Sequence, residues 1–186
     1  MNIEPSESFY RRECAEDWQA TYDEPRWYAL HTCAKHEKRV AQQLAERNVE
    51  QFLPLYESLR HWKDRRVRLQ LPLFSGYVFV RLPLRNRLQV LALPSVVRLV
   101  GFGGVAAAIA EIEIETLRQA LRPQLRVEPY PYLTKGKRVR ILDGPLKGAE
   151  GTLVRRKSGC RVILSVDLIA RAASVEIDAG DIERIP

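Results

Sequence analysis

The stretch GKRVRILDGPLKGAEGTLV, residues 136–154, decides the fold of the C-terminal part of the chain. Apolar and polar residues alternate before a Gly-Pro turn at 144–145, as in a short β-strand. Two later glycines, Gly148 and Gly151, allow a positive φ or the close approach of a neighbouring strand. Similar short segments follow, and several such strands in about 50 residues are typical of a small closed barrel. We therefore predict an all-β barrel over residues 133–186.

The segment before the barrel, residues 26–122, has a mixed pattern. Residues 27–32 and 77–82 are rich in aromatic and β-branched residues and are predicted to be strands. Apolar residues recur at helical spacing in residues 40–45 and again in residues 109–121. The order of these elements predicts an α+β domain in which helices pack on an antiparallel sheet.

Two segments lie outside these predicted domains. Residues 1–25 are predicted to form a flexible acidic arm, because residues 1–26 carry three basic and seven acidic side chains. Residues 123–132 contain three prolines and are predicted to form a linker. The chain is thus divided into an arm, an α+β domain, a linker and a barrel.

Charge is the first indication of function. The chain has a formal net charge of +7, and residues 60–98 contribute nine basic residues and one acidic residue, or +8. A polyanion, and nucleic acid first among them, is the natural partner of such a segment. The alternative reading is a solvated basic surface that only keeps the protein soluble.

The sequence contains no pattern typical of catalysis. It has no P-loop, no dinucleotide-binding glycine pattern and no nucleophile elbow, and Asp64 is the single carboxylate of the basic segment. The three cysteines are too few and scattered for a zinc site or a disulfide framework. We therefore expect a binding protein without metal or cofactor rather than an enzyme. The absence of a secretory signal and of a long apolar run predicts a cytoplasmic protein that binds no membrane. We also expect it to be a monomer.

The glycine and apolar positions of residues 136–154 resemble a KOW motif. Trp27-Tyr28, residues 72–80 and Gly101-Phe102-Gly103-Gly104 resemble the N-terminal (NGN) domain of NusG-type transcription factors, so the resemblance covers residues 27–186. Within the family, the segments near His36 are more similar to the specialised antiterminators of the UpxY and RfaH kind. The resemblance implies an NGN domain followed by an SH3-like KOW barrel.

The resemblance also implies a function and a binding face. Family members dock on the clamp helices of RNA polymerase, bridge its cleft and suppress pausing or termination, in specialised members at a specific operon. Alternation sends Tyr77 and Phe79 to one sheet face and Val78 and Val80 to the other. The alternative, that most of these rings are core, stays open. The positions that match the polymerase-binding depression are Tyr28, Phe74, Tyr77, Phe79, Leu99 and Phe102.

Specialised relatives also contact the non-template DNA strand, and a basic hairpin can lie along upstream DNA. A solvated helix face is the competing interpretation for the first helix. The candidate DNA-binding residues are His36, Arg39, Gln43 and Arg47 in the first helix and Arg60, Lys63, Arg65 and Arg66 in the hairpin.

In the barrel, the resemblance implies a partner-binding loop that includes Leu168, Ile169 and Arg171. The family uses this loop to bind a small-subunit ribosomal protein or the Rho terminator. Ile169 replaces the usual Phe and Ala170 the usual Gly, which makes Rho binding doubtful and leaves the ribosomal partner. A rival function is that of a ribosome-associated KOW protein that binds RNA without polymerase.

Overall fold

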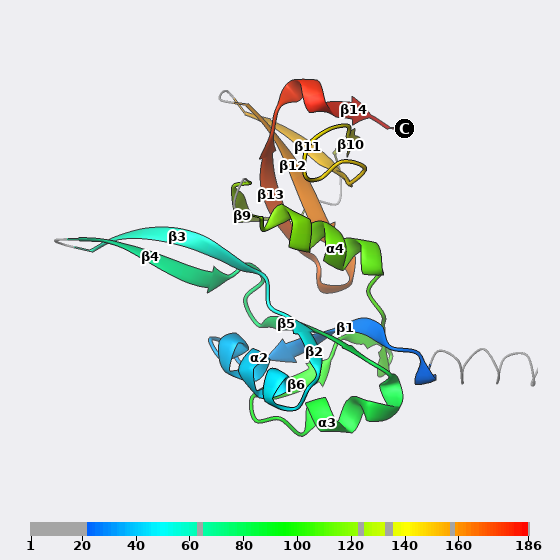
Figure 1. The fold of residues 1–186 in the computed structure, drawn as a ribbon. Helices are drawn as coiled ribbons and strands as arrows, with labels where there is room; N and C mark the ends of the chain where they lie inside the picture. Colours follow the sequence, from blue (N-terminus) through cyan, green and yellow to red (C-terminus); the bar gives the residue numbers. More distant parts are fainter. Residues whose placement is uncertain (1–21, 63–64, 123–124, 133–135, 157–158, 186) are drawn as a thin grey trace, which may run out of the picture.

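The computed structural model describes residues 22–62, 65–122, 125–132, 136–156 and 159–185. It has the predicted α+β domain and the predicted β-barrel, seen in the lower and upper halves of Figure 1. None of the helices within the described part of the chain is long and apolar enough to cross a membrane.

A four-stranded antiparallel sheet with helices on both faces forms the α+β domain. Its elements are β1 (Arg26–Thr32), α2 (Glu37–Glu46), β2 (Glu50–Phe52), β5 (Tyr77–Leu82), η1 (Leu84–Asn86), α3 (Arg87–Leu91), β6 (Val96–Leu99) and α4 (Glu111–Ala120). The strands lie in the order β2–β5–β1–β6, so β1 and β5 are central, as their apolar sequences predict. Helices α2 and α3 cover one face of the sheet, and α4 lies toward the other (Figure 1).

Two strand pairs extend from this domain. β3 (Leu55–Trp62) and β4 (Arg65–Pro72) form the predicted basic hairpin, a long ribbon that projects away from the body of the molecule (Figure 1). β7 (Gly101–Phe102) and β8 (Val105–Ala106) form a second, short hairpin. The apolar run of residues 95–102 alone would predict one continuous strand, but the chain ends β6 at Leu99 and makes this separate hairpin.

The barrel contains all the strands that the sequence predicts. They are β10 (Lys137–Ile141), β11 (Glu150–Arg156), β12 (Gly159–Val166), β13 (Arg171–Ile177) and β14 (Ile182–Arg184), with the short helices η2 (Asp167–Ile169) and η3 (Ala179–Asp181). Gly148 has a φ of +86°, and a Cβ on Gly151 would lie 2.5 Å from the Ile163 carbonyl oxygen. Both glycines therefore have the roles that the sequence predicts for them.

The segment predicted to be a linker contains an additional strand, β9 (Val127–Tyr130). β9 pairs with β13 and ends the six-stranded sheet, whose order is β14–β10–β11–β12–β13–β9. Pro129 lies inside β9. Proline is compatible with an edge strand, because one side of such a strand has no partner and the missing N–H group can face that side. Because β9 belongs to this sheet, only residues 121–126 separate α4 from the barrel sheet.

Most of the predicted acidic arm, residues 1–21, lies outside the described residues. The last residues of the arm contact the domain: the Arg87 guanidinium donates a hydrogen bond to the Tyr22 hydroxyl at 2.7 Å. Arg85 forms an ion pair with Asp23 at 3.1 Å. The chain just before β1 is therefore held against η1 and α3.

Candidate partner-binding surfaces

The two faces of the central sheet separate the aromatic residues as the alternation predicts. Phe79 and Tyr77 pack in the cluster on the α4 side, whereas Val78 and Val80 pack under α2 and α3. Phe74 meets Phe79 edge to face, with ring centres 6.1 Å apart. We call the side that carries Trp27, Phe74, Tyr77 and Phe79 the aromatic face.

Two residues predicted for this face lie on the opposite side of the sheet. Tyr28 is buried in the cluster under α2 and α3, and Leu99 packs against the same cluster. The reason for Tyr28 is the strand register, which pairs it with Val80 and pairs Ala29 with Phe79. Burial raises the pKa of the Tyr28 hydroxyl. These two residues therefore do not belong to the predicted aromatic depression.

Trp27 occupies the place that the sequence analysis assigned to Tyr28. Trp27 is 1% exposed, its Nε1 donates a hydrogen bond to the Glu111 carboxylate at 3.2 Å, and the Arg118 guanidinium carbon lies 4.9 Å from the ring centre. The same alternation that separates Tyr77 from Val78 would have identified Trp27, had the register of β1 against β5 been known.

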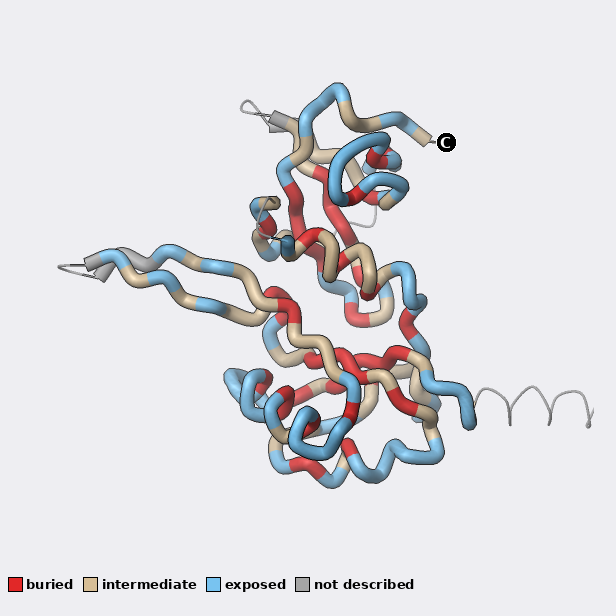
Figure 2. The backbone as a smooth tube through the Cα atoms, in the orientation of Figure 1, coloured by how far each residue is buried: buried red, intermediate tan, exposed pale blue. Residues whose placement is uncertain are grey.

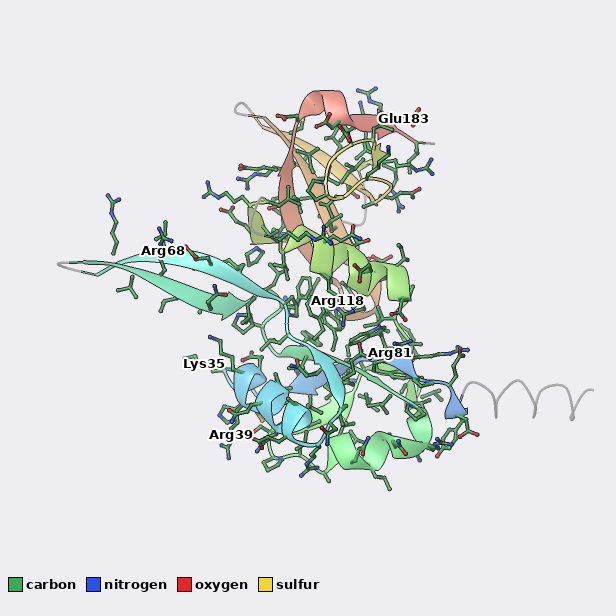
Figure 3. All side chains as sticks on the ribbon, viewed as in Figure 1. Lys35, Arg39, Arg68, Arg81, Arg118 and Glu183 are labelled. Carbon is green, nitrogen blue, oxygen red and sulfur yellow. The ribbon has the colours of Figure 1, made fainter. Side chains whose placement is uncertain are left out.

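Ion pairs hold α4 against the edge of the aromatic face. Arg118 pairs with Glu50 at 3.4 Å, and Arg81 pairs with both Glu50 and Glu111, at 3.6 Å and 3.5 Å. Figure 3 shows Arg81 and Arg118 in the region where α4 approaches the sheet. All these side chains are partly exposed, so each pair contributes less than about 1 kcal/mol, and their joint effect is to orient the helix.

The barrel covers the aromatic face. One continuous hydrophobic core joins the face, α4 and the barrel interior, and Figure 2 shows buried backbone on both sides of this junction. The Arg171 guanidinium carbon lies 5.9 Å from the centre of the Tyr77 ring, and Leu168 packs against the shared core. We call residues 167–171 the barrel loop.

This arrangement buries two of the rings that match the polymerase-binding depression, in agreement with the alternative that they are core residues. Phe74 and Phe79 are 2% and 0% exposed, and Tyr77 is half-buried. The physical reason is that α4 and the barrel supply the apolar surface that these rings would otherwise offer to a partner. Phe102, in contrast, is 74% exposed at the tip of the β7–β8 hairpin, away from the shared core. Of the barrel residues, Ile169 is buried and Arg171 is exposed.

The junction between α4 and the barrel is incompletely filled. A cleft of about 690 Å³ lies there, lined by Glu113 of α4 and by Tyr132 and Asp167 among others. The Tyr132 hydroxyl donates a hydrogen bond to Asp167 at 3.1 Å. Burial and, second, the Asp167 carboxylate raise the pKa of the Glu113 carboxyl. We call the packing of the barrel against α4 and the aromatic face the closed arrangement. It places the carboxylates of Glu113 and Asp167 near each other, which is unfavourable when both are ionised.

The predicted DNA-binding stripe lies on α2 and its ends. Arg39 is exposed, as Figure 3 also shows, whereas Gln43 is half-buried. His36 immediately precedes the helix and its Nδ1 lies 2.7 Å from the Ser95 hydroxyl oxygen. Arg47 follows the helix and donates a hydrogen bond to the Gln89 carbonyl at 2.7 Å. Arg39 is therefore the best placed of the four to reach a ligand, and Arg47 and His36 already have protein partners.

The projecting hairpin carries the second set of predicted DNA contacts. Arg66 is exposed, and the Arg68 side chain, 76% exposed, forms an ion pair with Glu57 at 3.4 Å. Lys63 and the side chains of Arg60 and Arg65 lie outside the described residues. The described part of the ribbon therefore presents Arg66 and Arg68 to solvent, whereas Tyr56 near its base packs against the shared core.

The described residues hold no group of three His, Cys, Asp or Glu side chains that could bind a metal ion. The surfaces described above offer aromatic, apolar and cationic groups for binding. The fold and these surfaces define a two-domain binding protein with an NGN-type domain and an SH3-like KOW barrel.

Comparisons with known proteins identify the family. The family model described as "Transcription termination factor nusG" matches residues 25–118. The "Transcription termination/antitermination protein NusG" of Haemophilus influenzae is 30% identical over 187 residues, covering 90% of this chain and 98% of that protein. The protein of the same name from Lactococcus lactis is 27% identical, covering 86% and 92%. The chain therefore belongs to the NusG family of transcription termination and antitermination factors.

A solved structure confirms the fold. The structure described as "Domain interaction in Thermotoga maritima NusG" has a TM-score of 0.52 and 19% identity, and covers 88% of this chain and 98% of that one. The relatives named above are NusG proteins, and a greater similarity to the specialised UpxY and RfaH kind remains a prediction.

Proposed function

We propose that this protein binds the clamp helices of RNA polymerase through its aromatic face, bridges the cleft and suppresses pausing or termination at a particular operon. The observation that carries the proposal is the gathering of Trp27, Phe74, Tyr77 and Phe79 on one face of a NusG-family domain. Aromatic side chains clustered on a preorganised sheet are the residues that dominate protein interfaces. The protein acts in the cytoplasm as a monomer and needs no cofactor for this role.

Docking requires the barrel to move. The Arg171 guanidinium lies over the Tyr77 ring, and Phe79 shares one core with α4 and the barrel, so in this proposal the barrel and α4 both shift before a polymerase helix packs on the face. The apparent affinity for polymerase is then the affinity of the uncovered face multiplied by the fraction of molecules in which it is uncovered. The contacts that hold the barrel down therefore belong to the binding mechanism.

DNA contacts add to this docking. Exposed cations on α2 and on the projecting hairpin, such as Arg39 and Arg68, are placed to contact phosphates of the non-template strand and of upstream DNA. When the barrel is displaced, its loop is freed to bind a partner, for which a small-subunit ribosomal protein is our candidate. Ala170 in this loop has a φ of +47°, a conformation that glycine adopts more easily.

The test is the affinity of purified polymerase for the Tyr77→Ala variant, measured in a chain whose barrel loop has been loosened by Leu168→Glu. Loss of the anchor is expected to weaken binding by about 1–3 kcal/mol. Tyr130→Ala, which removes a half-buried tyrosine of β9, is the matched control and should leave the affinity unchanged. Equal affinities of the two folded variants would reject the aromatic face as the docking site.

In vitro transcription provides the functional readout. On a template from the neighbouring operon, the full chain should shorten pauses or increase read-through at a terminator, and Tyr77→Ala should lose that effect at equal concentration. An unchanged pause duration with saturating protein would reject the proposed antitermination activity even if binding were observed.

A further inference from the structure

The outer edge of β13 is a pairing surface that the chain covers with its own connector. β9 lies antiparallel to β13, with Val127 opposite Val175 and Tyr130 opposite Ala172. β9 is not one of the barrel strands that the alternating pattern predicts, and without it β13 would be the unpaired edge of the sheet. The exposed edge of a sheet is the usual template for pairing with another extended segment.

The hold of β9 on this edge is limited. β9 has four residues, of which only Val127 is buried, whereas four consecutive residues of β13, 172–175, are buried. Pro129 has no N–H group to donate, and proline is confined to the outer edges of sheets, so β9 itself offers a poor edge to a further strand. A partner strand therefore gains a good pairing edge only by replacing β9.

The positive charge of Arg161 indicates which side chain a strand that replaces β9 should carry. Arg161 of β12 has a side chain only 15% exposed and pairs with Glu128 of β9 at 3.2 Å and with Glu176 of β13. The two carboxylates hold the guanidinium between them, and hydrogen bonds with Glu176 and Glu128 raise the pKa of Arg161. When β9 leaves, Arg161 keeps Glu176 and loses the carboxylate on the outer side. A strand with Asp or Glu at the position of Glu128 restores that contact.

Release of β9 also lengthens the connector. With β9 paired, residues 121–126 join α4 to the barrel sheet and span at most about 20 Å when extended. With β9 free, residues 121–136 do so, and their limit is about 55 Å. The strand that replaces β9 thus keeps the barrel on a longer tether.

We propose that β9 is a releasable strap and that the edge of β13 beneath it is a β-strand-addition site for an extended, carboxylate-bearing segment of a partner protein. The ligand presents an apolar residue opposite Val175 and a carboxylate toward Arg161, one position further along. This site is distinct from the barrel loop and does not depend on the polymerase docking proposed above.

The experiment uses the full chain and a synthetic peptide with the sequence of residues 125–132, LRVEPYPY, as the probe. Glu128→Arg in the protein reverses the charge that faces Arg161 and should release β9. We expect the peptide to shift the backbone NMR signals of residues 172–175 in this variant, with a wild-type affinity at least about tenfold weaker. Glu183→Arg, the same change on β14 at the other end of the sheet and visible in Figure 3, should behave as wild type.

Two further comparisons make the outcome decisive. A peptide with Arg in place of its Glu should bind the Glu128→Arg chain at least about tenfold more weakly, because Arg161 repels it. Val127→Ala, which removes the buried side chain of β9 and keeps Glu128, should also admit the peptide that carries Glu. The proposal is overturned if the signals of residues 172–175 stay unchanged at millimolar peptide in both folded variants, or if the two peptides bind equally.

Discussion

Leu168→Glu should uncover the aromatic face without unfolding either domain. Leu168 is half-buried in the barrel loop and packs against the core that the two domains share. Complete burial of a leucine contributes about 1.5–3 kcal/mol, so the half-buried side chain contributes about 1 kcal/mol. Placing a carboxylate against this apolar surface costs at least about another 1 kcal/mol. The closed arrangement should therefore lose about 2 kcal/mol, or about 30-fold in its population relative to the open one.

Two measurements report the effect of Leu168→Glu. NMR relaxation of backbone amides should show one common tumbling time for both domains in the wild type and a shorter time for the barrel in Leu168→Glu. The affinity for RNA polymerase should rise by up to about 30-fold, because the uncovered fraction limits apparent affinity. The first readout reports the domain contact alone, and the second adds polymerase docking.

Leu142→Glu is the matched control. Leu142 is also a barrel leucine, it is 44% exposed, and it does not pack against the shared core. This variant should tumble and bind as the wild type does. If Leu168→Glu folds, separates the domains and yet leaves polymerase affinity unchanged, then covering of the aromatic face does not regulate docking, and the reasoning above is wrong.

Three other changes test separate parts of the structure. Gly151→Ala should destabilise the barrel by about 2 kcal/mol or more in denaturant unfolding, because its Cβ would meet the Ile163 carbonyl oxygen at 2.5 Å. Glu113→Gln should raise stability at neutral pH: folding raises the pKa of this carboxyl, so its contribution is favourable below the ordinary carboxyl pKa and is lost as pH rises. The difference between Glu113→Gln and wild type should accordingly disappear in acid. Arg68→Ala should lower the slope of log affinity for duplex DNA against log salt by about 1, and an unchanged slope would exclude a phosphate contact.

Local sequence patterns predicted the elements of both domains because those patterns need only short-range information. Alternation identified the strands around Val139 and Val175, and the spacing of Val40 and Leu44 identified α2. The roles of Gly148 and Gly151 followed from backbone geometry that only glycine satisfies easily. For these parts of the chain, sequence reasoning was sufficient.

Contacts between residues far apart in the sequence cannot be predicted from these local patterns. Tyr28 and Trp27 are adjacent and both aromatic, and only the register of β1 against β5 decides which of them lies on the aromatic face. The proline-rich connector hides a strand, because pairing with β13 outweighs the weak strand propensity of its sequence. Burial of Phe74 and Phe79 depends on packing between two domains, which no periodicity within either domain reveals.

Site-specific photo-crosslinking tests the central claim most directly. A benzoylphenylalanine at position 77 in the Leu168→Glu chain places the reactive group on the aromatic face, and one at Val97, 54% exposed on β6, places it elsewhere. We predict that position 77 crosslinks to the clamp helices of RNA polymerase and that position 97 does not. Crosslinks from position 97 but none from position 77, with both proteins folded, would contradict docking through the aromatic face.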